Sequence, residues 1–150
     1  MTSAPSGDGP AGSFGNEAVA RMLAADAASG LLGIELTNLA VGSATVTMTI
    51  RPDMVNGHAI GHGGYVFLLA DTAFACACNT HGPVTVAASA DITFIRPVHV
   101  GDKLTAHAVE RITYGRSGIY DVTVRRGSET IAEFRGVSRR YSGPEPGSAS

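Results

Sequence analysis

The chain has 150 residues, a length that suits a single domain with its own hydrophobic core. Charged residues make up 16% of it, below the roughly one quarter that is usual in soluble domains, which suggests that some surface is buried in an oligomer. The net charge of −2 excludes a broad electrostatic attraction to nucleic acid or to a membrane.

The first residues contain no basic region followed by an apolar core, so no signal peptide is expected. The longest apolar run, residues 65–78, is too short to span a bilayer. The two cysteines, Cys76 and Cys78, would point about 200° apart on a helix, which argues against a disulfide between them. Together these features predict a cytoplasmic protein.

In chain order, the first expected element is a disordered leader at residues 1–15, which are rich in Gly, Ser, Pro and Ala. Asn16 is a suitable N-cap for a short helix that ends near Gly30. Residues 33–40 and 43–50 are predicted to be two strands joined by a tight turn, and the second of them alternates strictly between apolar and polar residues.

Residues 51–62 are predicted to be a loop, and residues 63–79 a helix that is apolar all round and therefore buried on every side. Strands are then expected at residues 84–97, 103–114, 119–126 and 130–141, arranged as an antiparallel meander. The turns between them are expected at residues 101–102, 115–118 and 127–128. An apolar helix followed by four strands is buried only if the sheet curls around it. The fold class is therefore α+β, with one domain at residues 16–142 and a flexible tail at residues 143–150.

Asp71 is the one formally charged residue between Asp53 and Asp91, and it stands in the middle of the apolar helix. A lone carboxylate in such surroundings costs several kcal/mol unless it is paired, hydrogen-bonded or protonated. It is either an acceptor in a structural hydrogen bond or a catalytic carboxylate, and burial alone does not decide between the two.

His62, Gly63 and Gly64 stand where this helix begins. Free backbone N–H groups at a helix N-terminus can bind an oxyanion, and glycine lets a substrate carbonyl approach the backbone. The alternative is that the glycine pair only makes a tight turn into the helix. Gly63 and Asp71 are eight residues apart, which is about 12 Å along a helix. If both act on one carbonyl, a two-fold dimer must bring them together.

These residues carry a resemblance to a known family. The segment from Asn56 to Gly64, NGHAIGHGG, and the following Leu69-Ala70-Asp71-Thr72-Ala73 resemble the hotdog-fold thioesterases. They are most similar to the phenylacetyl-CoA thioesterases of phenylacetic acid degradation. The similarity continues through Ala88-Ser89, Phe94-Ile95-Arg96-Pro97, Gly101-Asp102-Lys103-Leu104, Gly118-Ile119-Tyr120-Asp121 and Phe134-Arg135-Gly136, and it covers about residues 16–142.

The resemblance implies a long central helix wrapped by a curved antiparallel sheet, and a homodimer that doubles to a homotetramer. It also implies that acyl-CoA is hydrolysed at the subunit interface, with no metal and no cofactor, since coenzyme A is part of the substrate. By the same resemblance, the N–H of Gly63 polarises the thioester carbonyl and Asp71 activates water or attacks directly. Asn56 helps to hold the water or the carbonyl, and His62 and Thr72 flank the site.

For the rest of the substrate, Gly64 is expected to contact the acyl-CoA. Arg96, Arg116 and Ser117 are candidates for contacts with the phosphates of coenzyme A, although Arg96 can equally be an ordinary surface charge. Phe94 and Phe134 are expected in the core rather than in a pocket.

Three other interpretations are open. His58 and His62 with the two cysteines could form a zinc site, but the glycine-rich loop and the divergent cysteines argue against it. A hotdog hydratase or dehydratase could use His62. A non-catalytic acyl-CoA sensor is the third, but such sensors carry an added DNA-binding domain, for which the leader is too short.

Overall fold

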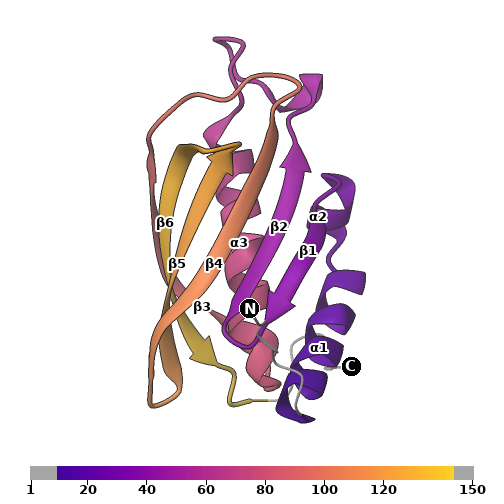
Figure 1. Ribbon diagram of the computed structural model, residues 1–150, viewed down its shortest axis with the longest axis vertical. Coiled ribbons are helices and arrows are strands. Elements are labelled where there is room, and N and C mark those ends of the chain that lie inside the picture. The colour runs from indigo at the N-terminus through magenta and orange to yellow at the C-terminus, as the bar shows by residue number, and fades with distance from the viewer. Residues whose placement is uncertain (1–9, 144–150) are drawn as a thin grey trace.

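The structure, a computed structural model, describes residues 10–143 (Figure 1). Residues 1–9 and 144–150, which hold most of the predicted leader and tail, lie outside the described residues. The elements are α1 (Pro10–Ala24), α2 (Ala27–Leu31), β1 (Glu35–Ala40), β2 (Ser43–Thr49), the 3-10 turn η1 (Pro52–Met54), α3 (Gly63–Cys78), the 3-10 turn η2 (Asn79–His81), β3 (Thr85–Phe94), β4 (Lys103–Tyr114), β5 (Ser117–Arg126) and β6 (Glu129–Arg140).

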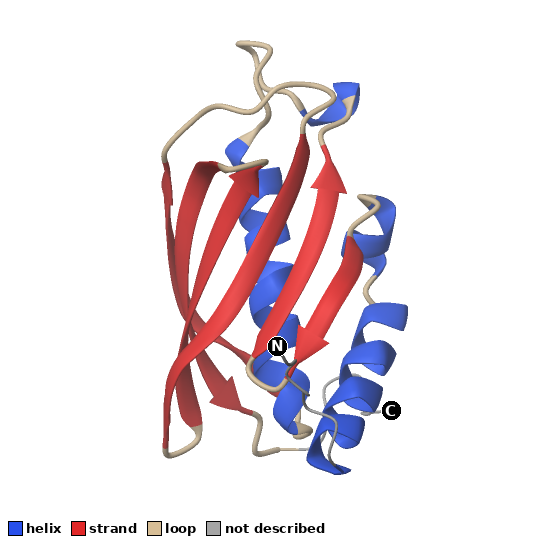
Figure 2. Cartoon of the chain, in the orientation of Figure 1, coloured by secondary structure: helices blue, strands red, loops and turns tan. Residues whose placement is uncertain are grey.

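One six-stranded antiparallel sheet, in the order β1-β2-β4-β5-β6-β3, curves around α3. Figure 2 shows α3 lying within this curve, with the two long loops gathered at the end where α3 begins. The predicted α+β architecture, a helix wrapped by an antiparallel sheet, is therefore confirmed. None of the described helices is long and apolar enough to cross a membrane.

Aromatic packing joins the helix to the concave face of the sheet. The ring of Phe74 on α3 stacks edge-on against Tyr120 of β5 and lies beside Phe134 of β6, with centroids 5.6 and 5.8 Å away. Gly136 leaves room for it, because a Cβ there would stand 2.8 Å from the Phe74 ring. The sheet can therefore close onto the helix at this point.

The N-terminal helical segment differs from its prediction. The expected single helix from residue 16 is two helices, and Asn16 lies inside α1 rather than at its cap. The described part of α1 runs from Pro10 to Ala24, so residues 10–15 are helical where a disordered leader was expected. The chain breaks after Ala24 because Asp26 caps the next helix, accepting from the backbone N–H of Ser29.

The strand β3 also differs from its prediction, because the expected meander of four strands does not form. β3 pairs with β6, from Thr85 opposite Arg140 to Phe94 opposite Ala132. Residues 95–102 carry the chain across the open end of the sheet to β4. β3 is therefore an edge strand of ten residues, and nearly all of it is exposed.

Helix α3, expected to be buried on every side, has an uncovered stripe. Gly64 is exposed, and Leu68, Asp71 and Ala75 are partly exposed, at the spacing of one helix face. Apart from Asp71, the residues of this stripe are uncharged. The stripe is therefore an apolar face of α3 that the chain covers incompletely.

Candidate functional site

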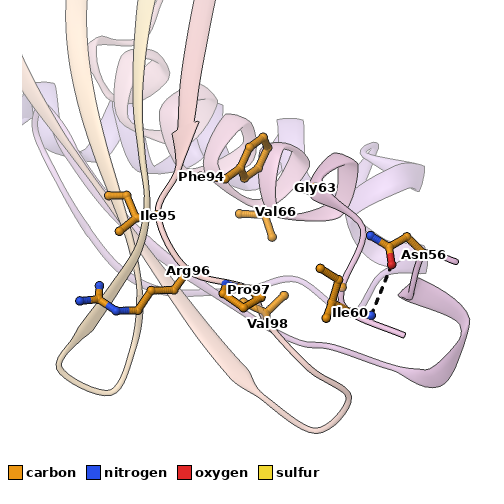
Figure 3. Close-up of a pocket in the computed structure, with 10 residues that line it drawn as sticks. Asn56, Ile60, Gly63, Val66, Phe94, Ile95, Arg96, Pro97 and Val98 are labelled. Atoms are coloured by element: carbon orange, nitrogen blue, oxygen red, sulfur yellow. Dashed lines mark hydrogen bonds between the residues drawn. The ribbon is translucent and has the colours of Figure 1, made fainter. Parts of the chain in front are cut away.

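A cavity of about 430 Å³ lies at the N-terminal end of α3 (Figure 3). The loop before α3 and the first turn of the helix form one wall, and the end of β3 with the crossing segment forms the other. The lining residues are Asn56, Ile60, Gly61, Gly63 and Val66 on the first wall, and Phe94, Ile95, Arg96, Pro97 and Val98 on the second. Most of these side chains are apolar, so the cavity suits an apolar group with a few polar contacts.

Asn56 organises the loop that closes the cavity. Its side-chain oxygen accepts from the backbone N–H of His58 over 2.8 Å and from that of Ile60 over 3.4 Å. The turn holds Ala59 in the left-handed region, at φ 61°. The side-chain oxygen of Asn56 is engaged in these two hydrogen bonds. Its amide NH₂ is available as a donor, because no acceptor for it is found among residues 10–143.

The N-terminus of α3 presents an unused donor at the cavity. The Nδ1 atom of His62 accepts from the N–H of Gly64 over 3.0 Å, so His62 is the helix cap, and a neutral ring must carry its proton on Nε2. The N–H of Gly63 has no acceptor within the described part of the chain. An unpaired N–H at a helix start favours an oxygen that becomes negative.

Phe94 explains why residue 63 is glycine. A Cβ on Gly63 would stand 2.9 Å from Cζ of Phe94, closer than such contacts allow. Phe94 was expected in the core, but it is 52% exposed and forms a wall of the cavity, so that expectation is wrong. Phe134, expected in the core, is buried there.

Asp71 lies on the uncovered stripe of α3, away from the cavity, whose lining does not include it. Burial raises the pKa of its carboxyl above the ordinary value, and the nearby charge of Asp26 raises it further. Its carboxylate makes no side-chain hydrogen bond or ion pair with any residue that the structure describes, so the alternative of a structural hydrogen bond finds no partner among those residues. One chain thus holds Gly63 and Asp71 about 12 Å apart along α3.

Thr72 is the next residue along α3, yet it turns away from Asp71. It is 5% exposed, and its hydroxyl lies 2.9 Å from that of Ser29 on α2. Ser29 in turn donates to Asp26, a residue that the sequence did not single out. The motif Asp26-Ala27-Ala28-Ser29 is a signal for a helix cap, but it does not reveal that the cap reaches α3.

The three residues proposed for phosphate contacts are not brought together in one chain. Arg96 donates to the carbonyl of Thr130 at the start of β6, whereas the carbonyl of Arg116 accepts from Arg140 at its end. Ten residues of strand separate these positions, which is about 33 Å. Arg116 and Ser117 instead line a small polar cavity of about 120 Å³ with His81, Thr85, Thr113, Gly115, Tyr120, Ser138 and Arg140.

The residues considered for zinc do not gather either. No group of three or more His, Cys, Asp or Glu side chains within the described residues is placed to hold a metal ion. Burial raises the pKa of the thiols of Cys76 and Cys78 to about 12, so both remain protonated and poorly nucleophilic.

Comparisons with known proteins find related sequences and similar folds. The family model described as the thioesterase superfamily matches residues 58–133. The chain is 46% identical over 125 residues to the acyl-coenzyme A thioesterase PaaI of Escherichia coli, covering 83% of this chain and 89% of that protein. The structure of the E. coli PaaI protein from the phenylacetic acid degradation operon superposes with a TM-score of 0.85 at 41% identity, over 89% of this chain and 97% of that one. A mutant of the phenylacetic acid degradation protein PaaI from Thermus thermophilus superposes with a TM-score of 0.75 at 37% identity, over 77% and 100% of the two chains.

Proposed function

Because the chain belongs to the thioesterase superfamily and is an acyl-CoA thioesterase of the PaaI type with the hotdog fold, we propose that its substrate is phenylacetyl-CoA or a ring-hydroxylated phenylacetyl-CoA. The products are the free acid and coenzyme A. Two observations support this substrate. The E. coli relative comes from the phenylacetic acid degradation operon, and the cavity beside Gly63 has apolar walls such as Ile60 and Phe94, which suit an aryl group.

The observation that carries the mechanism is the unpaired N–H of Gly63, which opens on the apolar cavity. The thioester carbonyl oxygen accepts from this N–H and becomes negative when the carbonyl carbon is attacked. The amide NH₂ of Asn56 is a second donor, to the same oxygen or to the attacking water. Asp71 of the partner subunit removes a proton from that water or attacks the carbon itself, and the coenzyme A thiolate leaves.

A dimer follows from the separation of Gly63 and Asp71. A two-fold axis lets one chain supply Gly63 and the other Asp71, which creates two identical sites. Two surfaces are suited to this contact, the exposed edge strand β3 and the uncovered stripe of α3. The proposal extends to a homotetramer built from two such dimers, and to a cytoplasmic enzyme that needs no metal or other cofactor.

The same dimer would give Arg116 a part in binding. If β3 pairs antiparallel with its copy, the start of one β3 lies beside the end of the other. The polar cavity with Arg116, Ser117 and Arg140 then lies next to the partner's substrate cavity, where it can bind the phosphates of coenzyme A. Arg96 lines the substrate cavity itself, so in this proposal it contacts the pantetheine arm.

We expect Arg116→Gln to raise KM for phenylacetyl-CoA about tenfold with little change in kcat, because a charged contact to phosphate is worth roughly 1.5–3 kcal/mol. With the phosphate-free N-acetylcysteamine thioester, the variant should match the wild type. Arg125→Gln removes an exposed arginine at the other end of β5 and is the control. An equal loss with both substrates would contradict a phosphate contact.

The central test is Asp71→Asn, assayed by thiol release from phenylacetyl-CoA. Removing a general base should lower kcat by about 10²–10⁴ while the fold and the dimer remain, as circular dichroism and light scattering would show. Asp53→Asn, which changes an exposed carboxylate outside the cavity, is the matched control. Near-normal turnover by a folded Asp71→Asn protein would remove Asp71 from the mechanism.

The other two interpretations gain no support from the site. A hydratase or dehydratase that uses His62 needs a free imidazole, whereas Nδ1 of His62 accepts the N–H of Gly64. A non-catalytic binder would release no thiol in the same assay. A panel of acyl-CoA substrates with thiol detection separates all three possibilities and also identifies the acyl group.

A further inference from the structure

A series of hydrogen bonds, partly buried at Asp26 and buried at Ser29 and Thr72, connects the α1–α2 junction to the helix that carries Asp71. Asp26 accepts from the backbone N–H of Ser29 through Oδ1 over 2.9 Å, and from the hydroxyl of Ser29 through Oδ2 over 2.7 Å. The hydroxyl of Ser29 lies 2.9 Å from that of Thr72. Ser29 is 3% exposed and Thr72 5%, so water has little access to their two hydroxyls, whereas Asp26 is partly exposed.

The donors in this chain all point one way. Ser29 has one hydroxyl hydrogen, and it is given to Asp26. The contact between Ser29 and Thr72 must therefore use the hydrogen of Thr72. A threonine that donates to Ser29 cannot also donate to a substrate, so Thr72 acts through the residues to which it is hydrogen-bonded or adjacent.

Capping alone does not explain the arrangement. An N-cap needs one side-chain oxygen for a backbone N–H, and Oδ1 of Asp26 already serves that purpose. The second oxygen holds Ser29, and through it the side chain next to Asp71 on a different helix. The helix α2 has only five residues, so its attachment to α3 depends on contacts of this kind.

We propose that Asp26 is a positioning residue for Asp71: through Ser29 and Thr72 it fixes α3 at the reacting carboxylate, and it presents a second negative charge to that carboxylate. This inference rests on the proposed role of Asp71 as the base. Asp26 thereby becomes part of the site, although it lies neither on α3 nor on the loop that closes the cavity.

The charges around Asp71 support the second half of the proposal. Burial raises the pKa of Asp71, and the charge of Asp26 acts in the same direction. Among residues 10–143, Asp26 and Cys78 are the titratable groups that interact with Asp71, and the thiol of Cys78 is neutral because its pKa is about 12. Asp26 is thus the charge that makes Asp71 a stronger base within the chain.

The substitution Asp26→Asn tests the charge while preserving the cap, since asparagine caps helices about as well as aspartate. We expect the acidic limb of the kcat–pH profile for phenylacetyl-CoA to move to lower pH, with the shift shrinking at high salt because salt screens the lost interaction. Glu17→Gln, which removes an exposed charge from α1, should leave the limb in place. An unmoved limb in Asp26→Asn overturns the proposal.

The variants Thr72→Val and Thr72→Ser test the link without touching the cap. Valine should lower kcat several-fold at constant KM and leave the pH limb in place, while serine should restore kcat. Wild-type kcat in Thr72→Val would overturn the positioning role. Turnover by Asp71→Asn separates this inference from the proposed function. If Asp71→Asn is inactive and the acidic limb of the Asp26→Asn profile is unmoved, only the present inference fails. If Asp71→Asn is active, Asp71 is not the base and both proposals fail.

Discussion

At Gly63, the first N–H of α3 and the absence of a side chain serve the same site. The N–H has no acceptor among the described residues, and the ring of Phe94 fills the space where a Cβ would stand. The sequence placed Gly63 and Asp71 correctly at the start and in the middle of one helix, because helical spacing depends only on residue number. Phe94 was misplaced, since an apolar side chain at a strand end can face either a core or a cavity.

Gly63→Ala should reduce activity without weakening the fold. Alanine favours a helix over glycine by about 0.5–1 kcal/mol, but its Cβ would force the Phe94 ring into the substrate cavity. We expect kcat/KM to fall at least tenfold while the urea midpoint stays the same or rises. Gly57→Ala is the control, because a Cβ there meets nothing within 4 Å. Full activity in Gly63→Ala would show that residue 63 tolerates a side chain.

At the scale of elements, strand positions were predictable and strand partners were not. Alternation located β4, β5 and β6 to within two residues, and the two-residue turn at Gly127-Ser128 is confirmed. The turn expected at residues 115–118 is shorter: Tyr114 already pairs with Ser117. Nothing in the alternation of β3 distinguishes β4 from β6 as its neighbour, because any antiparallel partner satisfies the pattern.

The end of α3 is attached to the sheet by a polar cluster at His81, Glu110 and Tyr120. His81 and Tyr120 both contact Oε1 of Glu110, at 2.6 and 2.7 Å. Burial alone would raise the pKa of Glu110, but the hydrogen bonds from His81 and Tyr120 outweigh it and hold the pKa below its usual value. This cluster therefore stabilises the fold when Glu110 is ionised, and its contribution is lost as the pH falls through the folded-state pKa.

Tyr120→Phe should lower the free energy of unfolding by about 1.5–3 kcal/mol at pH 7, the usual worth of a hydrogen bond to a charged group. Tyr120 is 1% exposed, so no water replaces the lost hydroxyl. Urea unfolding at fixed protein concentration measures the change, and the difference from wild type should shrink at acid pH as Glu110 protonates. Tyr114→Phe, at a half-exposed tyrosine, is the control. A difference that does not depend on pH would exclude Glu110 as the partner.

At the scale of the whole molecule, a single chain keeps Gly63 and Asp71 apart, so the proposed mechanism needs a second chain. The cavity with Gly63 lies at one end of α3, and Asp71 lies on its uncovered stripe. The sequence led to the same requirement from helix length, on the condition that both groups act on one carbonyl. It could not show which surfaces meet, since the exposure of β3 depends on its pairing with a distant strand.

Mixing two inactive variants tests whether the site is shared. In a mixed dimer of Gly63→Ala and Asp71→Asn, one site carries both substitutions and the other carries neither. After the subunits are mixed and exchanged, about half of the dimers are mixed, so activity should return to roughly a quarter of the wild-type value. As a control, Gly57→Ala mixed with Asp71→Asn should show only the activity of the sites whose Asp71 comes from a Gly57→Ala chain. No recovery in the first mixture would place the whole site within one chain.

The pairing of β3 with β6 also sets the order in which the protein can be completed during synthesis. The first residue of β3 pairs with the last residue of β6, so the strand that covers this side of α3 is the last one made. Until residue 140 has left the ribosome, an apolar helix and an unpaired strand stay exposed to other chains. A premature stop before β6 would therefore release an open, aggregation-prone sheet around a bare helix.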